Sequence, residues 1–197
     1  MRPLFSLLCG SLVALATASQ ASPGTAPTLA SAAQSQIGIT LHYDPSYQRL
    51  AYPNGDVPLE RGVCTDVVIR AYRQLGIDLQ KLVHEDMRAN WNAYPHPAKW
   101  ALKRPDTNID HRRVPNLAAF FRRHGTELAP SRDPHDYHPG DLVVWALPDG
   151  GLPHIGIVAD RISAAGTPLM IHNIGSGAKM EDVLFAFKVT GHFRYPK

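Results

Sequence analysis

Residues 62–76 read GVCTDVVIRAYRQLG. The apolar side chains of this stretch recur with the period of an α-helix, at Val63, Val67, Val68, Ala71, Tyr72 and Leu75. Gly76 follows the last of them and is a typical helix stop. We therefore predict an amphipathic helix over residues 63–75, with Cys64 in its first turn.

Cys64 lies where a thiol is ionised most easily. The unpaired N–H groups and the dipole at a helix N-terminus favour the thiolate, and a neighbouring imidazole can take the proton. The chain has one other cysteine, Cys9, inside an N-terminal apolar run. If that run is removed, Cys64 stands alone and no intramolecular disulfide can form. Such a cysteine is either catalytic or a buried core residue.

The rest of the chain predicts an α+β domain. Helices are expected at about residues 30–37 and 114–123, the second with Pro115 near its start and Gly125 beyond its end. Residues 80–110 read as irregular. Runs typical of strands follow at 142–146, 154–159, 168–172 and 185–195. Helices first and strands later indicate a mostly antiparallel sheet, on which the Cys64 helix would pack.

His154 is the candidate partner of Cys64. It opens a predicted strand in which alternation directs it to the same face as Gly156 and Val158. The missing side chain at Gly156 leaves room for another element. His172 ends the next predicted strand and could orient the imidazole through its second nitrogen, as in catalytic triads. Asn173 is the alternative for this role.

Three blocks resemble the NlpC-type branch of papain-like cysteine peptidases, which cleave the peptide stems of bacterial peptidoglycan. The blocks are residues 62–67, 139–145 and 154–160, the last followed by 171–173. Together, the blocks extend the resemblance over roughly residues 40–197. The stretch from Asp106 to Asn116 resembles an exported subfamily of that group, described as a domain of unknown function. Compared with the family, Val-Cys-Thr-Asp replaces the usual Asp-Cys-Ser-Gly, and residues 78–135 form an insertion.

The resemblance implies a role for each matching residue. Cys64 would be the nucleophile, His154 the general base and then acid, and His172 the orienting third member. In the family, a tyrosine about 12 residues before the cysteine donates its hydroxyl to the oxyanion hole. Tyr52 has this spacing, with Tyr43 and Tyr47 as competitors. The backbone N–H of Cys64 would be the second donor, and such donors lower a barrier by a few kcal/mol each.

The densest polar cluster of the chain lies in the insertion. We expect Asn108, Asp110, Arg112 and Arg113 to bind substrate, because arginine grips carboxylates in a bidentate fork and peptidoglycan stems carry free carboxylates. The alternative is a helix cap with solvated or paired arginines. Outside this cluster, Asp66 would stabilise the helix N-terminus and face away from Cys64.

The N-terminus predicts export. Residues 1–21 read as a signal peptide, with a positive start at Arg2 and cleavage after Ala21, or else after Ala18. Residues 22–27 would be a short tether and residues 28–197 the catalytic domain. We expect a periplasmic or secreted monomer with no membrane span after signal cleavage. Its net charge of +3 favours approach to an anionic wall, without the basic stripe of a nucleic-acid-binding protein.

The sequence thus predicts an exported cysteine amidohydrolase that acts on peptidoglycan or its fragments through a thioester intermediate. By resemblance, the bond is a γ-D-glutamyl–diaminopimelate link or the muramoyl–alanine amide. We expect no cofactor and no metal site, since the ten histidines do not form a zinc motif. The alternatives are a non-catalytic wall-binding module on the same fold, a thioester-forming transferase and a zinc hydrolase.

Overall fold

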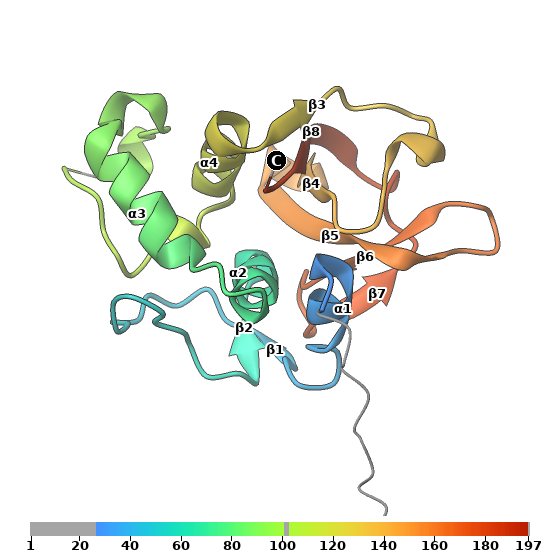
Figure 1. Ribbon diagram of the computed structural model, residues 1–197, viewed down its shortest axis with the longest axis horizontal. Coiled ribbons are helices and arrows are strands. Elements are labelled where there is room, and N and C mark those ends of the chain that lie inside the picture. The colour runs from blue at the N-terminus through green and yellow to red at the C-terminus, as the bar shows by residue number, and fades with distance from the viewer. Residues whose placement is uncertain (1–26, 101–102, 197) are drawn as a thin grey trace, which may run out of the picture.

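The computed structural model describes residues 27–100 and 103–196. The predicted signal peptide and almost all of the predicted tether lie outside these residues. Within the described ranges, no helix is both long and apolar enough to cross a membrane. The protein combines a six-stranded sheet with helices that lie against it (Figure 1).

The sheet is antiparallel throughout, in the order β3-β8-β4-β5-β6-β7. Its strands are β3 (Thr126–Leu128), β4 (Leu142–Ala146), β5 (Pro153–Ile162), β6 (Pro168–His172), β7 (Lys179–Glu181) and β8 (Lys188–Arg194). The predicted strands at 142–146 and 168–172 have the observed bounds. Two further short strands, β1 (His42–Tyr43) and β2 (Arg61–Gly62), form a separate parallel pair.

The helix that carries Cys64 is α2 (Cys64–Gln74), as the periodicity predicts. Gly76 ends it in a left-handed conformation with φ of 77°, which glycine adopts at little cost. Together, α2 and α1 (Leu29–Gln34) pack against β5 and bury Ala33, Val67, Val68 and Ala71. The α+β prediction, with the Cys64 helix on a mostly antiparallel sheet, is confirmed.

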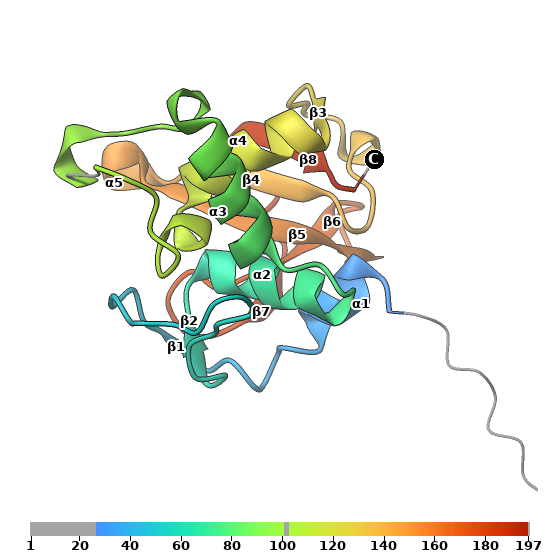
Figure 2. The same cartoon turned by 60° about the vertical axis from the view of Figure 1, so that its left-hand side comes forward.

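The expectation that residues 80–110 are irregular is wrong for the first third of that range. It holds α3 (Leu79–Ala89), which begins at an Asp78 cap and buries Leu79, Val83 and Met87 at helical spacing. Short 3₁₀ turns follow at Trp91–Ala93, Ala98–Trp100 and Asp110–Arg112, and then comes α4 (Val114–His124). Figure 2 shows α2, α3 and α4 on the same side of the sheet.

The two faces of the sheet bury different cores. On the helix side, Val144, Ile155, Ile157 and Ile171 pack with α2 and α4. On the far side, Trp145 packs with Tyr137, Val143, Val158, Met170 and Leu184 under the loops that precede β4 and β8. A short turn, α5 (Pro148–Gly151), joins β4 to β5. This arrangement brings the start of β5 next to the start of α2.

Candidate active site

Cys64 occupies the first position of α2, which follows the short strand β2. The amide of Asn173 donates hydrogen bonds to the carbonyls of Gly62, at 3.0 Å, and His42, at 3.3 Å, and so holds this strand pair beside β6. Asp66 accepts the Val63 N–H at 2.7 Å and caps the helix. The backbone N–H groups of the first helical turn have no partner inside the helix, so they can face a developing negative charge.

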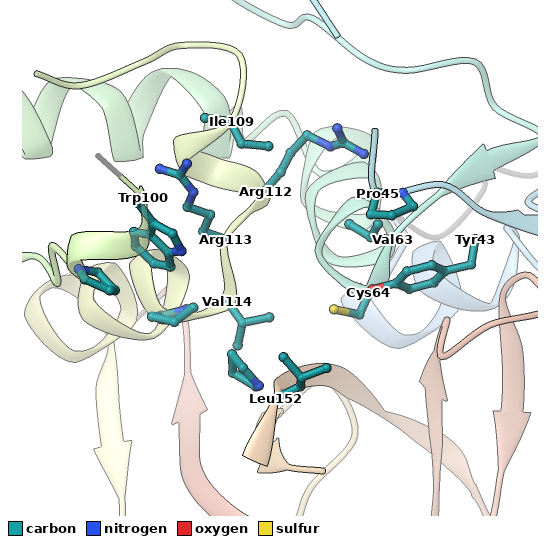
Figure 3. Close-up of a pocket in the computed structure, with 13 residues that line it drawn as sticks. Tyr43, Pro45, Val63, Cys64, Trp100, Ile109, Arg112, Arg113, Val114 and Leu152 are labelled. Carbon is teal, nitrogen blue, oxygen red and sulfur yellow. The ribbon is translucent and has the colours of Figure 1, made fainter. Parts of the chain in front are cut away.

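The side chain of Cys64 is 5% exposed, and its sulfur points into a cavity of about 340 Å³ (Figure 3). Burial raises the pKa of the thiol to about 12, and the charge of Asp66 adds to this rise. The nearby backbone N–H of Ile155 acts in the opposite direction and lowers the pKa. The sulfur therefore lies near the peptide that joins His154 to Ile155. The helix start was expected to favour the thiolate with the help of a neighbouring imidazole; in the resting protein the effect of burial on the Cys64 pKa outweighs that of the helix N-terminus.

His154 and His172 come together as predicted. Nε2 of His154 lies 2.8 Å from Nδ1 of His172, on adjacent strands. The His154 ring also stacks on Trp145, with ring centroids 5.6 Å apart. Gly156 makes this packing possible, since a Cβ there would lie 3.1 Å from both His172 Cβ and the Trp145 ring. Burial lowers the pKa of His154 to about 3, so its imidazole is neutral at pH 7.

The second nitrogen of His154, Nδ1, makes no hydrogen bond to any described residue. No hydrogen bond joins it to Cys64 in the same part of the chain. It is the nitrogen that remains to take the thiol proton if His154 Nε2–H donates to His172. Sequence reasoning missed the group behind this pair, Glu181, whose Oε2 lies 3.1 Å from Nε2 of His172 without hydrogen-bond alignment. Burial lowers the pKa of His172, and the charge of Glu181 raises it.

Tyr52 is not beside Cys64, and its assignment to the oxyanion hole is wrong. Its side chain is 42% exposed and contacts His84 on α3, with ring centroids 5.3 Å apart. Tyr43 lies next to Cys64 instead (Figure 3). Burial raises the Tyr43 pKa to about 12, with further contributions from Cys64 and Asp66. The pairing of Tyr43 with Gly62 in the β1–β2 ladder brings this tyrosine to the helix start.

Three of the four predicted substrate-binding residues are engaged inside the protein. Arg112 donates to both oxygens of Asp66 at 2.9 Å and also to the carbonyls of Asp44 and Ser46. Asn108 accepts the Leu50 N–H and donates to Tyr47 and Asp106. Asp110 is 1% exposed and accepts the Asp106 N–H. These residues fix loops, and Arg113 alone stays available in the cavity.

Residues 30–195 match the family described as Domain of unknown function (DUF1287). The chain belongs to this family. A protein of Escherichia coli (strain K12), titled "Uncharacterized protein YijF", is 55% identical over 195 residues, which cover 93% of this chain and 94% of that protein.

The solved structures that match this chain include one titled "Structure of NlpC1 from Trichomonas vaginalis". NlpC1 from Trichomonas vaginalis matches with a TM-score of 0.45 and 15% sequence identity. The match covers 85% of this chain and 44% of that chain, so this DUF1287 protein spans less than half of the length of NlpC1.

Proposed function

We propose that this DUF1287 protein is an exported cysteine amidohydrolase that cleaves an amide bond in peptidoglycan stem peptides. One observation carries the proposal. The Cys64 sulfur points into a cavity and lies near the backbone that follows His154, while His154 is 2.8 Å from His172. A thiol, an imidazole and a group that orients the imidazole are the parts that acyl transfer by a cysteine enzyme needs.

The reaction starts with the Cys64 thiol and the His154 imidazole both neutral. His154 Nδ1 takes the thiol proton as the sulfur attacks the amide carbon, and His154 Nε2–H stays on the His172 side. The oxyanion is held by the Cys64 N–H and the Tyr43 hydroxyl, which takes the role first assigned to Tyr52. His154 then protonates the departing amine. Water, deprotonated by His154, hydrolyses the thioester and restores the thiol.

The test is digestion of purified sacculi by wild-type protein and by the Cys64→Ala variant, followed by mass spectrometry of the released fragments. We expect new peptide fragments from the wild type alone, and their masses identify the bond. Sacculi that bind both proteins and release nothing would contradict hydrolysis and favour a wall-binding module. The same fragments from Cys64→Ala would show that the cysteine is not the nucleophile.

Alkylation of the free protein by iodoacetamide should depend on pH in the manner of a neutral thiol. Because burial raises the Cys64 pKa to about 12, the thiolate fraction is small at pH 7 and grows with each step in pH. We expect a rate at Cys64 that still rises between pH 7 and pH 9, measured by mass spectrometry of the labelled peptide. A rate that reaches its plateau below pH 7 would instead show a preformed thiolate.

Glu181 should act as a positioning residue through His172. Replacing it by glutamine removes the charge beside His172 and keeps the shape of the side chain. We expect kcat to fall about fivefold, equivalent to about 1 kcal/mol of lost charge stabilisation beside His172, with KM unchanged. The matched control is Glu127→Gln, on the opposite edge strand of the sheet. An unchanged kcat, or equal effects of both variants, would remove Glu181 from the site.

A further inference from the structure

The cavity beside Cys64 is apolar over most of its wall. Its lining includes Val63, Ile109, Val114, Leu152 and Trp100. The cations in this lining are Arg112 and Arg113. The side chain of Arg112 is only 2% exposed, and its charge is balanced by Asp66 at 2.9 Å. Arg113 therefore decides the electrostatic character of the cavity.

Arg113 is held in place but is weakly paired. Its guanidinium carbon lies 4.4 Å above the Trp100 ring, and the two side chains lie on the other side of the cavity from Cys64 (Figure 3). Its hydrogen bond to a described residue runs from Nη1 to Asp110 Oδ1 at 3.4 Å, longer than a strong charge-assisted bond of about 2.7–2.9 Å. Burial also raises the Asp110 pKa to about 6, so Asp110 loses its charge only as the pH falls through that value.

We propose that Arg113 binds a free carboxylate of the substrate next to the scissile bond, an inference that rests on the proposed hydrolysis at Cys64. A guanidinium presents a planar fork that matches a carboxylate, and stacking on Trp100 fixes its orientation before the ligand arrives. The apolar wall strengthens the attraction because it excludes water. Arg113 and Trp100 both belong to the insertion at 78–135, which thus supplies specificity to the cleft.

The test compares two forms of one wall tetrapeptide that contains the cleaved bond. One form has free carboxylates, and in the other they are carboxamides. For the wild type we expect kcat/KM to be at least about tenfold higher for the carboxylate form, as a charge-assisted bidentate contact provides. In the Arg113→Gln variant, kcat/KM should fall for the carboxylate form and stay unchanged for the carboxamide form, so the preference is lost. Arg113→Lys should keep part of the preference. Arg132→Gln, an exposed arginine outside the cavity lining, is the control and should keep the wild-type ratio.

The outcomes separate this inference from the proposed function. Equal kcat/KM for both forms in the wild type would overturn the role of Arg113 and leave the Cys64 chemistry intact. If the wild type cleaves neither form, hydrolysis is contradicted, and calorimetric binding of the same two peptides decides the inference. Equal affinities would then overturn it. The comparison in the wild type needs no variant, so a folding defect of Arg113→Gln cannot obscure the result.

Discussion

Replacing His154 by alanine should lower kcat/KM for a wall peptide by about 10³- to 10⁴-fold, because the Cys64 thiol loses the base that takes its proton. With a Cys64 pKa raised to about 12, little thiolate is available at neutral pH to compensate. The Cys64→Ala variant should lower kcat/KM by at least the same factor. Since the two residues act as a unit, the double variant should be no slower than Cys64→Ala alone.

The control for this series is His135→Ala. His135 is exposed on the turn Pro134–Asp136 and, among the described residues, pairs with Asp133, so its loss should leave kcat/KM within about twofold of the wild type. Rates are measured by chromatography of the released fragments, and circular dichroism checks the fold of each variant. If the losses of kcat/KM in Cys64→Ala and His154→Ala add in full in the double variant, a shared proton-transfer step is contradicted.

The second large effect concerns stability. The side chains of Asp66 and Arg112 are 4% and 2% exposed and form a bidentate pair at 2.9 Å. Removing one partner leaves an uncompensated buried charge, which costs about 3–5 kcal/mol. We therefore expect Arg112→Met to lower the free energy of unfolding by about this amount in urea titration. Asp66→Asn should do the same, and the double variant should cost less than the sum of the two.

A matched surface pair provides the control for the buried pair. Arg122 and Glu127 lie 3.0 Å apart with side chains 52% and 43% exposed, so Arg122→Met should change stability by less than about 1 kcal/mol. An Arg112→Met protein with wild-type stability and a raised KM would contradict the structural role. That result would restore Arg112 as a substrate-binding residue.

The sequence predicted those parts of the site that local patterns specify. The period of residues 63–75 placed Cys64 at a helix start, and alternating strands placed His154 and His172 on neighbouring strands. The sequence did not predict α3, because the helix has few core positions and is followed by a stretch rich in Asn, His, Pro and Trp. Turn and cap residues at Pro115 and Gly125 gave the bounds of α4 to within a residue.

Contacts between distant segments could not be predicted in this way. Tyr43 reaches Cys64 through a parallel pair of two-residue strands, which leaves no periodic signal. Glu181 meets His172 only because β7 adds to the edge of the sheet beside β6. The partner of Arg112 is Asp66, 46 residues earlier in the chain, so composition indicated a substrate clamp where the fold makes an ion pair. Burial of the thiol likewise depends on packing, which reversed the expected direction of the Cys64 pKa.

The most direct test of the account is a burst experiment on the acyl-enzyme. A nitrophenyl ester of the acyl group that the protein releases from sacculi makes acylation fast, so hydrolysis of the thioester limits turnover. We predict a burst of nitrophenol equal to the protein concentration and, after acid quenching, the acyl mass on the peptide that contains Cys64. Ester turnover by Cys64→Ala at the wild-type rate, with no acyl mass on Cys64 in the wild type, would contradict nucleophilic catalysis by this residue.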